Sequence, residues 1–241
     1  MKTMDCIDYQ VTMRDCDRFG RMRIGSWMAI CQDASERILD DWGMAIAPMM
    51  NKGVLWVVGR SYYELESAPG CEEWVRVITW PEKTRGGMIP WQYRMETPAG
   101  EVLARASVIW VMIDAESRSM LSRRIPKLTY TAPEPPAEPV ARAAGFAMPE
   151  LSQTDYRTAT YSETDINDHL TNTRYAEWMC DLLPLDWHAE RIPRRLNIDY
   201  RAEIKPGERV CLRHTMEGNT LFCRAEGKFD LRMEFAARTP R

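Results

Sequence analysis

The sequence lacks an apolar run of the roughly 20 residues that a membrane-spanning helix needs. Its first residues, MKTMDCIDYQVTM, hold one lysine and no apolar core of a secretory signal. The net charge is -3, so no general basic surplus is available to neutralise nucleic-acid phosphates. With 45% hydrophobic and 28% charged residues, the composition is typical of globular proteins, and we expect a cytoplasmic location.

Paired cysteine motifs are also missing. The chain has seven cysteines, an odd number, and none stands in a C-x-x-C pair. This pattern favours reduced thiols over a disulfide framework or a zinc site. The histidine and cysteine spacings offer no ligand set, so the sequence implies neither a metal nor an organic cofactor.

Proline is concentrated in the middle of the chain. Residues 126–149 hold six prolines and few large apolar side chains. Because proline fixes φ and removes a hydrogen-bond donor, this stretch predicts an extended linker between two domains. The predicted organisation is an N-terminal domain of residues 1–126, a linker of residues 127–153 and a C-terminal domain of residues 154–241.

Each predicted domain reads as one strand, then one helix, then several further strands. In the first domain, apolar residues at helical spacing predict a helix over residues 26–42, with Ser26 as N-cap and Gly43 as the end. In the second, a helix is predicted over residues 172–183, ended by Pro184. Strands are expected at 7–14, 55–66, 73–80, 89–97 and 102–114, and again at 155–163, 195–204, 209–217, 221–226 and 229–236. These elements predict an α+β class with antiparallel strands.

The two halves align with each other, which indicates an internal duplication. The segment Asp17-Arg-Phe-Gly-Arg-Met lies over Asp165-Ile-Asn-Asp-His-Leu, and the same shift places Trp27 on Tyr175. Further on, Tyr63-Glu-Leu-Glu-Ser-Ala-Pro-Gly lies over Tyr200-Arg-Ala-Glu-Ile-Lys-Pro-Gly. Two matches in the same order favour a duplication over chance.

One of the three histidines stands out. We expect His188 to be solvated in a polar loop, and His214 to be at the surface or half-buried within a strand. His169 lies in a dense run of hydrogen-bonding side chains, Thr164-Asp-Ile-Asn-Asp-His-Leu-Thr-Asn, just before a helix. Such a run can be an ordinary capped loop. The first half, however, starts its helix with Phe19 and Arg21 at the positions of Asn167 and His169.

This segment resembles the D-x-N-x-H-x-x-N motif of plant and bacterial acyl-ACP thioesterases. Downstream, Leu196-Asn-Ile-Asp-Tyr-Arg-Ala-Glu203 resembles the strand that carries the catalytic acidic residue of that family. The resemblance extends over nearly the whole chain. It implies a tandem hot-dog fold, in which two antiparallel sheets join edge to edge and each wraps around a long central helix.

The resemblance assigns the catalytic positions to Asp165, Asn167, His169 and Glu203. Ile204 stands where one plant variant has a cysteine, so a water-based mechanism is expected. Glu203 or His169 would activate the water, and Asn167 would position it or bind the substrate. Asp165 would hold the Asn167 and His169 side chains. The N-terminus of the helix near Asn172 would offer N–H groups to the thioester oxygen. The alternative for Glu203 is a rim carboxylate paired with Arg201 or Lys205.

Two further features fit this resemblance. In the family the N-terminal half accommodates the acyl chain, so the tryptophans at 56, 74, 80, 91 and 110 would be either channel or core residues. Acyl carrier protein (ACP) is acidic, so its docking surface should be basic. A basic cluster near the site contains Arg191, Arg194, Arg195, Arg201, Lys205 and Arg209, although such a cluster can also be an ordinary solvated face.

Three functions compete. Hydrolysis of fatty acyl-ACP leads, because tandem duplication with the D-x-N-x-H motif favours ACP over CoA and because all four catalytic positions hold competent residues. Hydrolysis of acyl-CoA and non-catalytic binding of acyl chains are the alternatives. A dehydratase is less favoured because no second His or Asp pairing of that type is found. The sequence leaves the acyl-chain length open and is compatible with a monomer or a homodimer.

Overall fold

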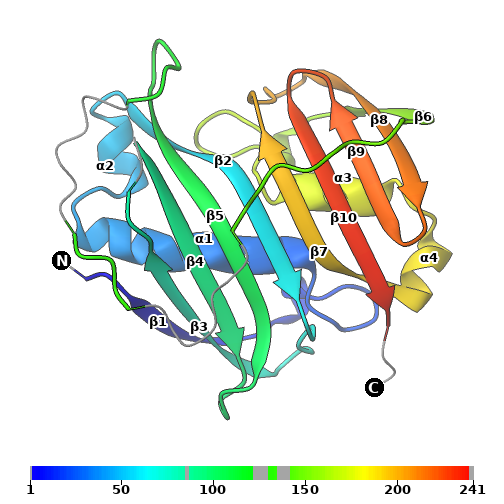
Figure 1. Cartoon of the computed structure of the whole chain (residues 1–241), viewed down its shortest axis with the longest axis horizontal. Helices are drawn as coiled ribbons and strands as arrows, with labels where there is room; N and C mark the ends of the chain where they lie inside the picture. The colour runs from blue at the N-terminus through cyan, green and yellow to red at the C-terminus, as the bar shows by residue number, and fades with distance from the viewer. Residues whose placement is uncertain (1, 85–86, 122–129, 135–141, 239–241) are drawn as a thin grey trace.

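The computed structural model describes residues 2–84, 87–121, 130–134 and 142–238, whose strands form a single antiparallel sheet (Figure 1). Its ten described strands follow the order β1-β3-β4-β5-β2-β7-β10-β9-β8-β6. The first half supplies β1 Asp5–Gln10, β2 Val54–Leu65, β3 Trp74–Pro81, β4 Met88–Glu96 and β5 Val102–Asp114. The second supplies β6 Gln153–Thr158, β7 Arg191–Tyr200, β8 Arg209–Glu217, β9 Thr220–Ala225 and β10 Phe229–Ala237.

The strand order is the same in both halves when each is read from its outer edge inward. The halves meet where β2 pairs with β7, with Ser61 opposite Ile198. On this junction Arg60 pairs with Asp199 at 3.0 Å, and Arg195 pairs with Glu64 at 2.8 Å. The expected α+β class and the edge-to-edge joining of two hot-dog sheets are confirmed.

The long helix α1, Ile24–Asp41, crosses one face of the sheet (Figure 1). Its apolar stripe was predicted correctly, and the side chains at 27, 30, 31, 34 and 38 are buried. Gly43 ends the helix region with φ +67°, which suits glycine. The prediction of Ser26 as N-cap is wrong: the cap is Arg23, and the Ser26 hydroxyl donates to the Asp15 carbonyl at 3.0 Å.

The second half has two short helices in place of the single predicted one. Helix α3 spans Arg174–Asp181, and α4 spans Leu185–Glu190 with Pro184 at its N-cap. Proline cannot continue a helix but suits the start of the next one, which explains the break. A further short helix, α2 Ile46–Met50, follows α1 and carries too few residues to leave a periodic pattern.

The first strand of each half is shorter than predicted. A 3-10 turn follows each one, Met13–Asp15 after β1 and Tyr161–Glu163 after β6. Thr12 with Asp15, and Thr160 with Glu163, form reciprocal capping boxes. The identical turn at matching positions supports the internal duplication.

The central proline-rich segment is described in part. Residues 127–129 and 135–141 of the predicted linker lie outside the described residues. Residues 130–134 and 142–152 contain neither helix nor strand, and the second stretch crosses the face of the sheet opposite α1 (Figure 1). There the Asn197 amide donates to the Ala144 carbonyl at 3.3 Å, and Arg232 lies over the Phe146 ring. We retain the two-domain division at 127–153 as a proposal.

None of the helices within the described ranges is both long enough and apolar enough to cross a membrane.

The junction between the halves should carry much of the stability. Leu196 on β7 is 0% exposed and pairs in register with Tyr63, whereas Leu185 on α4 is 68% exposed. Leu196→Ala should lower the free energy of unfolding by about 2–5 kcal/mol because it leaves a cavity. Leu185→Ala removes the same atoms at the surface and should change it little. Urea unfolding measures both, and equal effects would contradict a core that runs through the junction.

Candidate functional site

The candidate site is formed by two loops of the second half, one before α3 and one after β7. A bridge between Thr164 and Leu170 closes the first loop on itself. The Leu170 N–H then donates to the Ile204 carbonyl at 2.8 Å and ties the first loop to the second. This backbone bond brings Asp165, Asn167 and His169 to the loop that carries Glu203.

Asp165 fixes the backbone of the first loop. Its Oδ1 accepts the Asn167 N–H at 2.8 Å, and its own N–H donates to the His169 carbonyl at 2.9 Å. Asp165 was expected to hold the side chains of Asn167 and His169, but in the structure it contacts their main chains instead. The pKa of the Asp165 carboxyl group is raised, mainly because the surrounding protein removes part of its hydration and so disfavours the charged form.

The same loop geometry recurs in the first half with different side chains. There Asp17 accepts the Phe19 N–H at 2.9 Å and donates to the Arg21 carbonyl at 2.8 Å. Gly20 has φ +73° and Asp168, at the matching position, has φ +61°, a left-handed backbone that glycine and aspartate tolerate. Since this geometry forms with Phe19 and Arg21, it does not require Asn167 or His169.

His169 and Glu203 form the polar centre of the site. Nε2 of His169 lies 2.9 Å from Oε2 of Glu203, and the imidazole is largely buried. The other carboxylate oxygen accepts a hydrogen bond from Arg118 at 2.8 Å. Glu203 pairs neither with Arg201 nor with Lys205 in the described contacts, so the rim-carboxylate alternative is not observed.

Glu203 lies beyond the end of β7, whereas the sequence placed it on a strand of residues 195–204. The strand runs over Arg191–Tyr200, displaced toward the N-terminus. The chain leaves the sheet because the N–H groups of Arg201 and Ala202 both donate to the Lys228 carbonyl. The Lys228 ammonium group then donates to the Glu203 carbonyl at 2.7 Å, which fixes the loop.

The protein environment favours neutral His169. Burial lowers its pKa below the usual 6.5, and Arg118 lowers it further, while Glu203 acts in the opposite direction. With a neutral imidazole, the nitrogen facing the carboxylate is the one that carries the proton, so Nε2–H donates to Glu203. This leaves Nδ1 as a proton acceptor at neutral pH.

Two asparagines present unpaired acceptors. The side-chain oxygens of Asn167 and Asn172 are buried and have no hydrogen-bond partner among the described residues. Both residues line the same cavity as His169. A buried polar atom without a partner is costly, so these oxygens are suited to receive a hydrogen bond from water or a ligand.

The helix terminus expected at Asn172 is shifted. Helix α3 begins at Arg174 with Thr173 as its N-cap, and the Arg174 N–H already donates to the Thr171 carbonyl at 2.9 Å. The first helical N–H is therefore committed within the chain. Asn172 stays a candidate binding residue through its side chain, while the predicted helix-terminus contact to an oxyanion is wrong for this N–H.

Ligand-binding cavities commonly measure about 300–1,000 Å³, and the cavity at this site measures about 850 Å³. It extends from the two loops of the candidate site into the first half of the chain. Its walls there come from α1, β2 and β5, through Gln32, Glu36, Trp56, Val58, Trp110 and Val111. Among the five tryptophans considered, only Trp56 and Trp110 line it; Trp80 and Trp91 are buried core residues, and Trp74 is exposed.

Sequence reasoning missed Arg118, Gln32 and Glu36. Arg118 lies in a turn after β5 and reaches Glu203 across the junction of the halves. Gln32 and Glu36 stand one helical turn apart on α1, which gives them a common face. Their helical spacing could be recognised in the sequence, but only the fold shows that this helix face lines the cavity.

The expectations for the other histidines were wrong: His188 lies in α4 with Nε2 2.9 Å from the Cys180 carbonyl, and His214 is buried beside Asp155.

The predicted basic cluster is divided by the structure. Arg194 and Arg195 lie within β7, and Arg195 pairs with Glu64 and Glu234. Arg201 and Lys205 lie beyond the strand and line the cavity, with Arg201 paired to Asp230. Of the predicted docking residues, therefore, only Arg201 and Lys205 border the candidate site.

Arg118 should tune the titration of His169. Its positive charge lowers the pKa of His169, so Arg118→Met should raise that pKa, while Arg14→Met, at an exposed position of the 3-10 turn Met13–Asp15, should not. Histidine ring NMR signals followed against pH report the value directly. Because the folded-state pKa lies below that of the unfolded chain, folding stability falls as pH drops below about 6.5, and Arg118→Met should reduce that fall. An unchanged or lower pKa in Arg118→Met would contradict this coupling.

Comparison with known proteins gives consistent matches. A family model of the acyl-ACP thioesterase N-terminal domain matches residues 5–127, and one of the C-terminal domain matches residues 148–233. The chloroplastic palmitoyl-acyl carrier protein thioesterase of Arabidopsis thaliana is 27% identical over 180 residues, which cover 69% of this chain and 42% of that protein. The chain thus spans less than half the length of this curated relative.

Solved structures share the fold over the full chain. An acyl-ACP thioesterase from Bacteroides thetaiotaomicron has a TM-score of 0.80 at 23% identity, covering 97% of this chain and 98% of that one. A 12:0-ACP thioesterase from Umbellularia californica has a TM-score of 0.79 at 16% identity, covering 98% of each chain. With both domain models matched in order along one chain, the protein belongs to the acyl-ACP thioesterase family.

Proposed function

We propose that this protein hydrolyses fatty acyl-ACP to a free fatty acid and ACP. The observation that carries the proposal is the pair of His169 and Glu203, 2.9 Å apart at one end of a cavity of about 850 Å³. The side-chain oxygen of Asn167 lines the same cavity without a partner among the described residues. Family membership and the name of the plant relative support ACP as the carrier.

In the proposed mechanism, water attacks the thioester carbonyl. Neutral His169 accepts a proton from the water at Nδ1 while its Nε2–H is held by Glu203, which also stabilises the imidazolium that forms. The C–S bond then breaks, and the imidazolium returns the proton to the departing thiolate. The Asn167 oxygen accepts a hydrogen bond from the attacking water. His169 is thus the general base and Glu203 the residue that orients it.

The acyl chain would extend from this centre between α1 and the first-half strands. Trp56 and Trp110 are held in place because their indole N–H groups donate to the Met44 carbonyl and to the Tyr93 hydroxyl. Rigid aromatic walls favour a defined chain length. Cys180 takes no part, because burial raises the pKa of its thiol to about 12 and it lines a different hollow.

The hydrolysis itself is tested with purified acyl-ACPs of increasing chain length, with acyl-CoAs run in parallel and thiol release as the readout. His169→Gln and Glu203→Gln should each lower kcat/KM by about 10²–10⁴-fold. His188→Gln and Glu64→Gln, which remove the same groups away from the cavity, should retain most activity. For the wild type, kcat/KM should fall as His169 becomes protonated, at a pH below the ordinary histidine pKa of about 6.5, because burial lowers the pKa of His169.

Each alternative has a distinct result. If CoA esters are turned over and acyl-ACP is not, CoA would replace ACP as the proposed carrier, and the proposed site would be unchanged. Binding of acyl chains without turnover of either substrate would contradict the catalytic proposal. Full activity in both His169→Gln and Glu203→Gln would place the reaction elsewhere.

ACP docking is proposed at the rim of the cavity formed by Arg201 and Lys205. Lys205 is exposed, and it borders the cavity. Lys205→Glu should raise KM for acyl-ACP by roughly three- to tenfold at low salt, because a rim charge acts mainly on encounter with an acidic partner. The uncharged acyl-N-acetylcysteamine thioester should be unaffected. Arg14→Glu is the matched control, and an equal effect of both substitutions would argue against this docking surface.

A further inference from the structure

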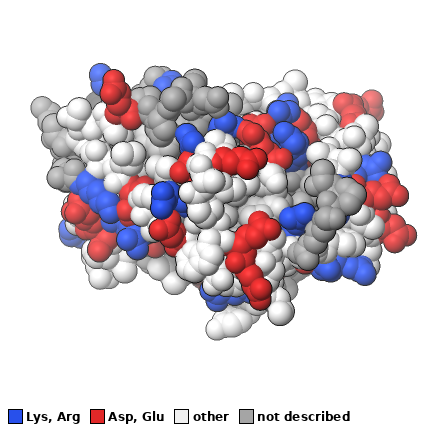
Figure 2. Space-filling view, turned by 90° about the horizontal axis from the view of Figure 1, so that it is seen from below, with Lys and Arg blue, Asp and Glu red and all other residues white. Residues whose placement is uncertain are grey.

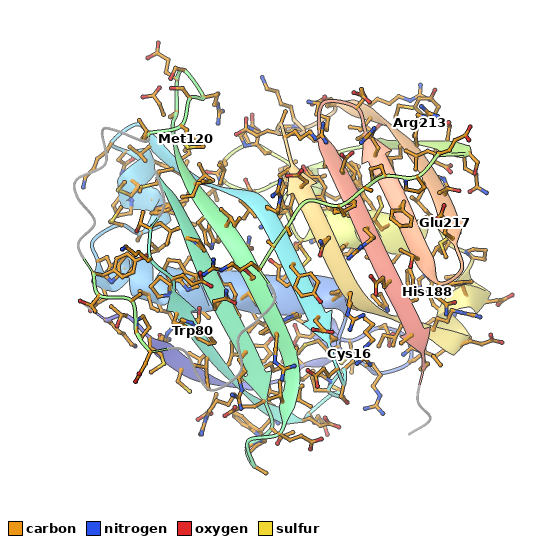
Figure 3. All side chains as sticks on the ribbon, in the orientation of Figure 1. Cys16, Trp80, Met120, His188, Arg213 and Glu217 are labelled. Atoms are coloured by element: carbon orange, nitrogen blue, oxygen red, sulfur yellow. The ribbon has the colours of Figure 1, made fainter. Side chains whose placement is uncertain are left out.

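A second hollow lies at the other end of the sheet. It measures about 590 Å³ and is formed by residues 17–25 of the first half together with α3 and α4 of the second. Figure 3 shows Met120, which lines the catalytic cavity, near the upper end of the sheet, and His188, which lines this hollow, lower down. The two cavities are related by the duplication, because each joins a helix-entry loop of one half to the helix of the other.

This hollow cannot repeat the proposed chemistry. Phe19 and Arg21 stand at the positions of Asn167 and His169, so the acid–base pair is missing. The walls are instead largely apolar, with Phe19, Met22, Ile24, Leu183, Leu185 and Ile192 among the lining residues. The hollow therefore has the character of a binding site for an apolar chain.

One wall of the hollow contains a largely buried arginine, Arg238. The Arg238 side chain is 11% exposed and lies over the Phe19 ring, 4.4 Å from its centroid. Nη2 pairs with Asp17 at 2.7 Å, and Nε donates to the His188 carbonyl at 3.0 Å. Its Nη1 is buried and has no hydrogen-bond partner among the described residues. This N–H pair is not solvent-accessible, so a carboxylate would reach it only after the Arg238 side chain shifts toward the hollow, where it could form a charge-assisted hydrogen bond.

Three arginines and three acidic residues line the hollow, but they are not all paired with one another. Arg238 is balanced by Asp17, while Glu177 and Asp181 pair with Arg174 and Arg157, which do not line the hollow. Arg18 and Arg23 also line it, and neither forms an ion pair with an acidic group in the described contacts. Figure 2 views the molecule from the end where β10 finishes, and basic residues stand there among acidic and uncharged ones.

We propose that this hollow binds a long-chain carboxylate, with the carboxylate group on Arg238 and the alkyl chain along Met22, Leu183 and Ile192. The ligand class follows from the combination of apolar walls, two lining arginines without an acidic partner in the described contacts (Arg18 and Arg23) and an unpaired buried N–H group. The site is separate from the cavity at His169, and it binds without hydrolysing. Occupation of this site does not require the proposed thioesterase activity.

The test is equilibrium binding of decanoate to the full chain by isothermal titration calorimetry. The wild type should bind two decanoate ions, one in each cavity. Leu185→Asp introduces a negative charge at the rim of the hollow, and Arg238→Gln removes the guanidinium. Each should weaken binding at one site by about tenfold or more and leave the other unchanged. Decyltrimethylammonium, a cation of the same tail length, should not bind the hollow.

Controls separate binding from loss of structure. Met13→Asp adds the same charge at a residue that is 83% exposed and outside the hollow, and it should retain both sites. Leu185 is itself exposed, so Leu185→Asp should unfold at the wild-type temperature even if Arg238→Gln does not. Binding that is insensitive to both substitutions, or equal binding of the cation at this site, overturns the proposal. If a protein without thioesterase activity binds two decanoates, the carboxylate site in the hollow is supported and only the catalytic proposal is contradicted.

Discussion

The pairing of β2 with β7 is the contact on which the rest of the structure depends. It converts two five-stranded sheets into one surface and sets α1 against loops that belong to the other half. His169 and Glu203 come from the second half, but Arg118 and the apolar walls of their cavity come from the first. Without this edge-to-edge contact, the polar centre would have no chamber beside it.

Burial and charge act together at the polar centre. Removing His169 from water disfavours its protonated form, and Arg118 adds to this effect from the far side of Glu203. A neutral imidazole held by a carboxylate is the state needed to accept a proton. The fold thus favours the neutral imidazole through burial and through Arg118, which is distant along the chain. An isolated His–Glu pair in water would have neither effect.

Much of the fold could be predicted from the sequence because its signals are local. Helix α1 has a continuous apolar stripe, and the strands alternate between clear turn residues, so most elements lie within a few residues of prediction. The first loop of the candidate site could be identified from the sequence because Asp165, Asn167 and His169 are close together along the chain. The juxtaposition of His169 with Glu203 came from family resemblance, since no local pattern links the two segments.

The errors arise mainly from contacts that local residue patterns do not reveal. The end of β7 is set by bonds to Lys228, and the start of α3 by a bond from Arg174 to Thr171 within a loop held by Glu163. Arg118 gave no sequence signal because its partner is distant along the chain. The basic cluster was contiguous in sequence, but a strand spreads its residues over its length and over both faces, so proximity along the chain did not give a single patch.

The covalent joining of the two halves has an evolutionary consequence. In a dimer of identical hot-dog subunits, every substitution appears at both symmetry-related sites, so neither can be altered without the other. Here Asn167 and His169 at one end face no such restriction from Phe19 and Arg21 at the other. A single chain can therefore keep one end for chemistry while the opposite end drifts toward a different task.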